Sequence, residues 1–362
     1  MSLHLATISL RDFRNLHELE VALAPGMNVL VGHNAVGKTN TIEAIQLLTS
    51  GTSFRKPSPR ELVREGCEQA SIAARLEGDG RILDVSCEVT PRRRAYKRNG
   101  KPARPKDISG TMLSVLFNPD DLTFVKGSAS YRREEIDAFA AQANKAYYRV
   151  LHSYQRGVEQ RNRLLKEEIV DTSLLEAWDA SIALGGATLL VARMRLFGRL
   201  AERTREAYAS IAPGEELACS YVCSLGVDPA NMTREQLEQA FLDRLEQGRA
   251  DDLRRQQTLV GPHRDDISFT LDGRDARTYG SQGQQRSIVL AWKMAEVMVS
   301  RDVTGELPLL LLDDVMSELD ETRREAVSSF VLQGIQTVVT TTNLGYFTPE
   351  LLEGAKVVRF DD

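Results

Sequence analysis

The sequence predicts an α/β protein, with mixed sheets and helices, whose nucleotide-binding part is interrupted by a helical arm. The first observation is an apolar run at residues 27–31, followed by Gly-x-x-x-x-Gly-Lys-Thr and a helically spaced run at residues 42–48. A second apolar run, at residues 307–312, ends in two aspartates. The third is the stretch 131–168, which has no proline and one glycine and is rich in helix formers.

The bulk composition is that of a soluble globular protein. Of the 362 residues, 42% are hydrophobic and 27% are charged, and the length suggests two domains or one enlarged domain. No uninterrupted apolar run approaches membrane-spanning length, so we expect a cytoplasmic protein without a membrane partner. The four cysteines, expected to be idle thiols, form no C-x-x-C pair: Cys67, Cys87, Cys219 and Cys223.

The Gly-Lys-Thr stretch, here called the phosphate-binding loop, has the strand-loop-helix context that the motif requires. Its backbone N–H groups and the helix N-terminus would surround phosphates. Lys38 would reach the β- and γ-phosphates, and Thr39 would hold Mg²⁺. We expect these residues to bind nucleotide: Gly32, His33, Asn34, Ala35, Val36, Gly37, Lys38, Thr39 and, in the following helix, Thr41.

Strands are expected on both sides of this loop. Residues 3–10 and 18–23 precede it, and residues 70–76 and 82–89 are expected to form an antiparallel pair. Asn99-Gly100 then predicts a hairpin inside residues 91–106, here called the basic ribbon. The ribbon has eight cations and no acid in a chain of net charge −5, so it is one candidate DNA surface. The residues proposed to contact DNA are Arg92, Arg93, Arg94, Lys97 and Arg98.

The arm is expected to contain long helices. One or two helices would span residues 131–168, a second run would extend from a capping box at residues 173–176 to about residue 210, and another would span residues 233–255. The first two runs would form an antiparallel hairpin. Their arginines are either ordinary solvated positions, which we favour, or a second DNA surface: Arg156, Arg161, Arg163, Arg193, Arg195, Arg199 and Arg203. We expect a discontinuous head, residues 1–128 and 255–362, with residues 129–254 as the inserted arm.

Three later segments narrow the chemistry. Asp313 and Asp314 end an apolar strand, where Asp313 would hold Mg²⁺ through water and Asp314 would orient or deprotonate the attacking water. Residues 281–286, here called the signature segment, place a serine and a glycine at a helix N-terminus. Residues 317–320 follow the aspartates and also fit a capping box for the next helix.

Together and in this order, these segments resemble the head of an ATP-binding-cassette ATPase. The resemblance implies an ABC-type P-loop head in which the signature segment of one subunit contacts the γ-phosphate bound by the other, so that ATP joins a homodimer. Ser281, Gly283 and Gln284 match the signature, with Gln282 in place of a glycine. Asp320 matches the loop that communicates across such a dimer.

Within that superfamily, the chain resembles the RecF family of bacterial recombination-mediator ATPases, which are related to the Rad50 and SMC heads. The resemblance implies recognition of duplex DNA or of the edge of a single-strand gap, cooperation with RecR and RecO, and help in loading RecA. The matching stretches are residues 10–15, 32–39, 53–55, 117–122, 131–133, 261–266, 281–286, 312–315 and 317–320.

Two departures from the wider superfamily point to a switch. The usual Walker-B glutamate is the shorter Asp314, so hydrolysis should be slow. The histidine expected after the next strand is absent, and residues 341–343 are Thr-Thr-Asn. The alternative function is the nucleotide-binding subunit of an ABC transporter, which the arm, the missing histidine and the basic ribbon disfavour. A small-molecule kinase would have no use for Ser281 or Asp320.

Overall fold

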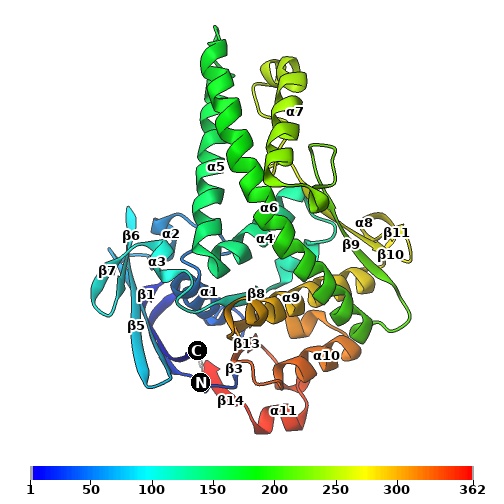
Figure 1. The fold of residues 1–362 in the computed structure, drawn as a ribbon. Helices are drawn as coiled ribbons and strands as arrows, with labels where there is room; N and C mark the ends of the chain where they lie inside the picture. Colours follow the sequence, from blue (N-terminus) through cyan, green and yellow to red (C-terminus); the bar gives the residue numbers. More distant parts are fainter. Residues whose placement is uncertain (1–2, 361–362) are drawn as a thin grey trace. The chain divides into compact units, whose positions relative to one another are not determined.

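A computed structural model describes residues 3–360 of the chain (Figure 1). The chain divides into two compact units, one formed by Met1–Leu122 with Val289–Asp362 and the other by Thr123–Ile288. The first unit is therefore discontinuous in sequence. The division into head and arm drawn from the sequence places the boundaries elsewhere and stays a prediction.

A five-stranded parallel sheet runs through the first unit in the order β14-β3-β13-β12-β8. Apart from the last residue of β3, all residues of β3, β12 and β13 are buried, as expected for a parallel sheet covered on both faces. The strands are β3 (Met27–Gly32), β8 (Ser114–Phe117), β12 (Leu309–Asp313), β13 (Thr337–Thr341) and β14 (Lys356–Phe360). Strands from before and after the arm thus pair in one sheet.

A second, antiparallel sheet has the order β2-β1-β4-β5-β6-β7. The six strands are β1 (His4–Phe13), β2 (Leu16–Ala22), β4 (Ala70–Gly78), β5 (Arg81–Thr90), β6 (Arg93–Arg98) and β7 (Lys101–Ala103). The helices of this unit are α1 (Lys38–Thr49), α2 (Pro59–Leu62), α3 (Pro105–Ile108), α10 (Glu321–Val331) and α11 (Pro349–Glu353), and α9 (Gln282–Thr304) crosses the unit boundary.

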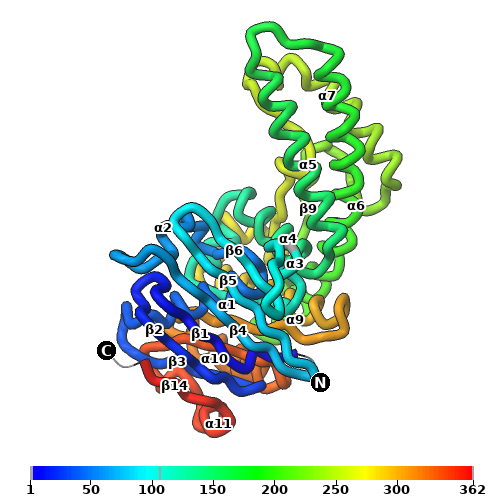
Figure 2. The backbone as a smooth tube through the Cα atoms, turned by 90° about the vertical axis from the view of Figure 1, so that its left-hand side faces the viewer, coloured from blue at the N-terminus to red at the C-terminus, as the bar shows by residue number. Residues whose placement is uncertain are grey.

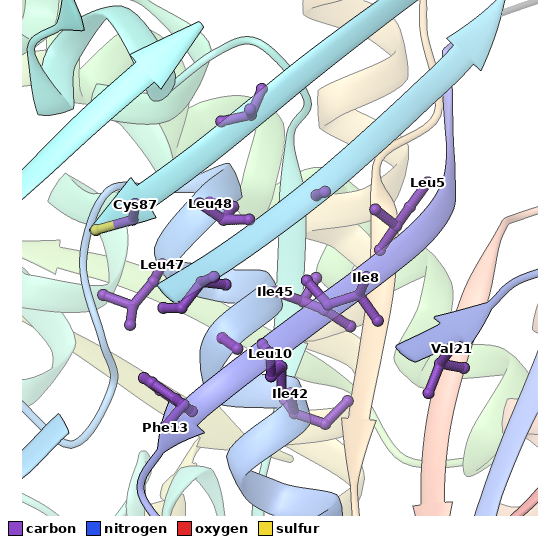
Figure 3. Packing of buried hydrophobic residues seen from close by; sticks show 14 of the residues in the cluster. Leu5, Ile8, Leu10, Phe13, Val21, Ile42, Ile45, Leu47, Leu48 and Cys87 are labelled. Atoms are coloured by element: carbon purple, nitrogen blue, oxygen red, sulfur yellow. The ribbon is translucent and has the colours of Figure 1, made fainter. Parts of the chain in front are cut away.

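The core of the first unit forms where β1 and its neighbours pack against α1. Figure 3 shows Ile8, Leu10 and Phe13 of β1 beside Ile42 and Ile45 of α1, and all five are essentially inaccessible to solvent. The alternation of β1 and the helical spacing of α1 direct these side chains inward. This packing fixes the position of α1, whose first residue is Lys38.

The second unit contains long helices and a three-stranded sheet. Helices α5 and α6 run side by side in both views (Figures 1 and 2). The sheet has the order β11-β10-β9. The elements are α4 (Ala129–Ala143), α5 (Lys145–Leu164), α6 (Thr172–Ile211), β9 (Leu217–Val222), α7 (Arg234–Arg255), β10 (Asp266–Leu271), β11 (Arg274–Asp275) and α8 (Ala276–Tyr279).

Several details of the arm differ from the sequence prediction. Helix α6 begins two residues earlier than expected, because Asp171 and not Ser173 caps it, accepting from the backbone N–H groups of Ser173 and Leu174. Strand β9, which pairs with β10, was not predicted. All four cysteines are free thiols.

Helix α6 is the one helix within residues 3–360 that is long and apolar enough, by length and composition, to cross a membrane. The core helix of a globular protein passes the same test, and α6 buries Leu175, Ile182 and Leu189 in the described fold. Its apolar character therefore has an explanation in packing.

Candidate functional site

The phosphate-binding loop connects β3 to α1 through backbone that only small residues adopt readily. Gly37 has φ +106°, and a Cβ there would lie 2.4 Å from a methyl group of Leu16. Ala35 also has positive φ, +69°. His33, Asn34 and Ala35 are exposed at the turn. The loop thus presents backbone at the N-terminus of α1, where an anion is favoured.

Lys38 lies under this turn. Its ammonium donates to the carbonyl oxygens of Gly32 (2.7 Å) and His33 (2.6 Å). Burial lowers the pKa of Lys38, and the nearby carboxylates of Asp314 and Asp313 oppose that effect. The Lys38 ammonium, which the sequence assigns to the phosphates, is therefore held at the loop by hydrogen bonds to backbone carbonyls.

The ends of β12 and β13 and the first turn of α1 meet at Asp313. Thr39 donates its hydroxyl to Asp313 Oδ1 over 2.9 Å, and Thr340 donates to the same oxygen over 2.8 Å. Thr340 also accepts from the backbone N–H of Asp314 (2.9 Å). Burial raises the pKa of Asp313. The pairing of β12 with β13 sets Asp313 beside Thr340, so the register of the sheet builds this contact.

Asp314 differs from its neighbours in its backbone conformation and in the hydrogen bonding of its carboxylate. Its φ is +54°, in the left-handed region that non-glycine residues adopt at some cost. Its Oδ1 is buried and, in the part of the chain that the structure describes, has no hydrogen-bond partner. Burial raises the pKa of Asp314, and the Lys38 ammonium opposes the rise. A buried acceptor without a donor is a position for a polar ligand or a water.

This donor set fits Mg²⁺ with a nucleotide. Mg²⁺ takes oxygen ligands and is usually bound by one or two carboxylates together with substrate phosphates. Thr39 and Asp313 supply a hydroxyl and a carboxylate that already touch. Among residues 3–360 no group of three or more His, Cys, Asp and Glu side chains could hold a metal. Mg²⁺ held at Asp313 would take its remaining oxygen ligands from bound phosphate and water.

A buried network behind the loop was missed as such in the sequence. Glu43 of α1 is fully buried and accepts from Arg14 (2.8 and 3.0 Å), Ser53 (2.5 Å) and Arg55 (3.4 Å). Asn15 donates its amide to the carbonyl of Ala35 over 2.6 Å. The residues around Glu43 in this network come from the stretches 10–15 and 53–55, which match the RecF family. Their polar side chains support α1 and the loop.

Thr41 differs from the other loop residues. It is fully buried, and its hydroxyl donates to the carbonyl of Gly37 within α1 over 3.1 Å. Helix geometry, which points the side chain of residue 41 into the protein, explains this position. Its assignment to the nucleotide stays a prediction.

The signature segment opens α9 in the second unit. Ser281 and Gln284 form a reciprocal cap: the N–H of Gln284 donates to Ser281 Oγ (3.1 Å), and the N–H of Ser281 donates to Gln284 Oε1 (2.8 Å). Ser281 is exposed, whereas Gly283 and Gln284 are half-buried. A Cβ on Gly280 would lie 2.5 Å from the carbonyl oxygen of Ala276, so a glycine is needed just before the segment.

The predicted hairpin of the basic ribbon is present as β6 and β7, at the edge of the antiparallel sheet. Tyr96 is buried and donates to the carbonyl of Gly51 over 3.2 Å, so the ribbon is packed and ordered. Lys97 pairs with Glu88 of β5 at 2.7 Å. The side chains of Arg92, Arg93 and Arg98 are exposed, and that of Arg94 is half-buried.

Two arm arginines lie inside the protein, which corrects the expectation of an exposed arginine face. Arg193 is 1% exposed and is held by Asp137, Tyr221 and the carbonyl of Pro262. Arg161 is 0% exposed and contacts Asp179 and Asp252 at 2.5 and 2.7 Å. Helix–helix packing covers these positions, which a charge pattern read along one helix does not reveal.

Residues 261–266 turn out to join the arm helices to the small sheet. His263 accepts from the hydroxyl of Tyr154 at Nδ1 (2.6 Å) and donates from Nε2 to the carbonyl of Thr258 (3.0 Å). Burial lowers the pKa of His263 to about 4. Asp265 accepts from Tyr221 (2.7 Å) and from the N–H of Ser224 (2.7 Å). This motif supports the scaffold of the second unit.

Comparison with known proteins gives a family for the whole chain. A family model described as the RecF/RecN/SMC N terminal domain matches residues 4–353. The DNA replication and repair protein RecF of Heliobacterium modesticaldum is 39% identical over 99% of this chain and 97% of its own length. RecF of Symbiobacterium thermophilum is 40% identical over 94% of this chain and 92% of its own length.

Solved structures agree. The recombination mediator protein RecF, solved with ATP and with ATPrS, is similar to this chain with TM-scores of 0.88 and 0.89 at 32% identity, over 96% of this chain and 94% of that one. An Smc head domain from Pyrococcus furiosus shares the fold, with a TM-score of 0.57 at 18% identity. The predicted ABC-type ATPase fold is confirmed. The chain belongs to the RecF family, an ATP-binding branch of the RecF/RecN/SMC ATPases.

Proposed function

We propose that the protein is an ATP-dependent DNA-binding switch that acts, as the RecFOR pathway implies for its relatives, in recombinational gap repair and the SOS response. The observation that carries this proposal is the full-length similarity to RecF solved with ATP, at 32% identity. The contact between Thr39 and Asp313, at the ends of neighbouring elements of the head, supports it from within the chain.

In this proposal the phosphate-binding loop receives the triphosphate, and Lys38 moves from the carbonyls of Gly32 and His33 to the β- and γ-phosphates. Thr39 and Asp313 would hold Mg²⁺, which supplies charge neutralisation on the phosphates. Asp314, whose Oδ1 has no partner within the described residues, would accept a hydrogen bond from the attacking water. Its short side chain supports slow turnover, which suits a switch.

Two copies would dimerise through ATP, with Ser281, Gly283 and Gln284 of one copy contacting the nucleotide of the other. Ser281 is exposed at a helix N-terminus, which supports a role toward an anion outside its own unit. The DNA partner would be a duplex or the junction of a duplex with a single-strand gap. The proposed protein partners are RecR, RecO and the RecA pathway, and the cytoplasmic location stays a prediction.

The transporter alternative is not favoured. The curated relatives that match nearly the full length of the chain are DNA replication and repair proteins. The second unit, with α6 packed among α4, α5 and α7, is also shared with the RecF structures because the similarity covers 96% of the chain.

The test is dimerisation measured by light scattering with Mg²⁺ and ATP, ADP or no nucleotide, each with and without gapped DNA. We expect a dimer with ATP only, and tighter DNA binding by that dimer. The key variant is Ser281→Arg, which should leave ATP binding by the monomer intact and block dimerisation.

Two results would overturn the proposal. A wild-type protein that stays monomeric with ATP would remove the switch. A Ser281→Arg variant that dimerises normally would show that the signature segment does not meet the partner's nucleotide.

A further inference from the structure

Glu215 lies in the turn between α6 and β9 and touches the signature segment. We infer that Glu215 is a positioning residue, which holds the signature segment in the shape needed for a partner's nucleotide and ties that segment to the arm helix α6. The inference rests on the proposed function, because it takes Ser281 to meet a nucleotide across a dimer.

The two carboxylate oxygens of Glu215 serve two different elements. Oε1 accepts from the side-chain amide of Gln284 at 2.9 Å, and Oε2 accepts from the hydroxyl of Tyr208 at 2.5 Å. Tyr208 is a fully buried residue of α6, whereas Gln284 belongs to the first turn of α9. One side chain thus bridges the 40-residue arm helix and the signature segment.

The bond to Gln284 fixes which way that amide faces. With Nε2 donating to Glu215, Oε1 faces the backbone N–H of Ser281 and accepts from it at 2.8 Å. Both partners favour this orientation, because the flipped amide would set its N–H₂ group against the N–H of Ser281 and its oxygen against the carboxylate of Glu215. Glu215 therefore protects the cap that shapes residues 281–284.

The cap in turn orients the Ser281 hydroxyl. Ser281 Oγ accepts from the N–H of Gln284 at 3.1 Å, so the hydroxyl proton is directed elsewhere. Ser281 is exposed, and its proton is available for an acceptor such as a phosphate oxygen. Loss of Glu215 would loosen this arrangement without removing any group that touches a nucleotide.

The backbone beside Glu215 is itself fixed. The N–H of Glu216 donates to Asp272 Oδ1, and the N–H of Asp272 donates to the carbonyl of Glu216, both at 2.9 Å. Strand β9 then pairs with β10 from Leu217 onward. The Glu215 carboxylate therefore projects from a rigid sheet edge. A change in the position of Tyr208 in α6 would be transmitted to Gln284 through Glu215. By thermodynamic linkage, a ligand that shifts the conformation of α6 would also shift the dimerisation equilibrium, and dimerisation would shift the conformation of α6.

The experiment compares Glu215→Ala and Glu215→Gln with wild type, and uses Glu216→Gln as the matched control. Glu216 is exposed, and only its backbone takes part in the contacts described above. Each variant is measured for monomer affinity toward a fluorescent ATP analogue, for ATP-driven dimerisation and for the midpoint of thermal unfolding. A double-mutant cycle with Gln284→Ala measures the coupling of the two side chains.

We expect Glu215→Ala to weaken ATP-driven dimerisation about tenfold, a loss typical of one bond to a charged group. Glu215→Gln, which keeps one acceptor oxygen, should fall between Ala and wild type. Monomer ATP affinity should stay at the wild-type value, and the unfolding midpoint should fall only slightly, through loss of the bond to the buried Tyr208 hydroxyl. The effects of Glu215→Ala and Gln284→Ala on dimerisation should not add.

The outcomes separate this inference from the proposed function. If Ser281→Arg blocks dimerisation but Glu215→Ala dimerises as wild type, Glu215 has no positioning role and the switch stands. If Glu215→Ala lowers dimerisation only in proportion to a lowered unfolding midpoint, its role is structural and the inference fails. If Ser281→Arg itself dimerises normally, the proposed function fails first.

Discussion

Lys38 and Arg193 are both buried cations, 7% and 1% exposed, but their surroundings differ. Lys38 has two backbone carbonyls as acceptors and two aspartates nearby. One of them, Asp314, has a buried oxygen without a donor among residues 3–360. Arg193 forms a bidentate pair with Asp137 and further bonds to Tyr221 and the carbonyl of Pro262. At Lys38 this arrangement leaves room for a ligand, whereas at Arg193 the bonds to protein groups make the cation part of the scaffold.

The same comparison separates the two candidate DNA surfaces. The basic ribbon keeps Arg92, Arg93 and Arg98 exposed, although Lys97 is paired with Glu88. In the arm, Arg161 and Arg193 are buried in ion pairs and cannot meet phosphates in this fold. Exposed arm arginines such as Arg163 and Arg195 remain, so the ribbon is the better candidate and the arm the alternative.

The largest expected effect is at the phosphate-binding loop. Lys38→Ala should weaken ATP binding by a factor on the order of a thousand, because two bonds to charged phosphate are lost. Titration with a fluorescent ATP analogue measures this, and the free energy of unfolding without nucleotide should change little. Lys38→Arg should keep some binding but lose turnover, since a planar fork does not replace a compact ammonium. Normal ATPase activity in Lys38→Ala would remove the assignment.

Arg193→Met should show the opposite pattern. It leaves the buried Asp137 carboxylate without its cation, which costs about 3–5 kcal/mol of unfolding free energy. Denaturant unfolding measures the loss, and Arg195→Met, at an exposed position of the same helix, should change the free energy by no more than about 0.5 kcal/mol. Equal effects at the two positions would mean that the burial of Arg193 contributes nothing.

His263, which belongs to the scaffold as Arg193 does, makes the free energy of unfolding depend on pH. Its pKa in the fold is about 4, against an ordinary value of 6.5, so the unfolded chain binds the proton more readily between these pH values. The stability from this residue is therefore fully present above pH 6.5 and is lost as pH falls toward 4. The change is about 3 kcal/mol as an order of magnitude. His263→Gln should flatten the dependence of unfolding free energy on pH over this range.

Asp314→Asn tests the proposed nucleotide site a second time. The variant keeps the size of the side chain and the neighbouring Asp313, but it removes the base, so hydrolysis should slow by about a hundredfold. ATP should then hold the dimer longer, and light scattering after ATP addition measures its lifetime. A variant dimer that dissociates as fast as wild type would make Asp314 a bystander to hydrolysis.

The smallest effect concerns the two DNA surfaces. Each phosphate neutralised contributes about 0.9 to the slope of log affinity against log salt on duplex DNA. Replacing Arg93, Arg94 and Arg98 by alanine should flatten that slope and spare ATP-driven dimerisation, whereas replacing Arg163, Arg195 and Arg199 should leave it near wild type. The reverse result would move the DNA surface to the arm.

In wild type, the dimer's slope should be roughly twice the monomer's, because two copies of the ribbon meet one duplex.

The sequence by itself determined the local parts of this protein. The glycine spacing and apolar flanks placed the phosphate-binding loop between a strand and a helix, and the apolar run ending at Asp313 placed the acidic pair at a strand end. These features depend on neighbours within a few residues, where backbone conformation and periodicity are readable from residue types.

Tertiary structure alone decided which distant residues meet. Thr340 contacts Asp313 because β12 and β13 pair in one register, and Glu43 gathers Arg14 and Arg55 because α1 packs where those segments pass. Arg193 is buried because α4, α5, α6 and residues 261–266 converge on it, although an arginine in a helix is by residue type expected at the surface. Contacts between segments separated by tens to hundreds of residues depend on packing and register, which local pattern does not specify.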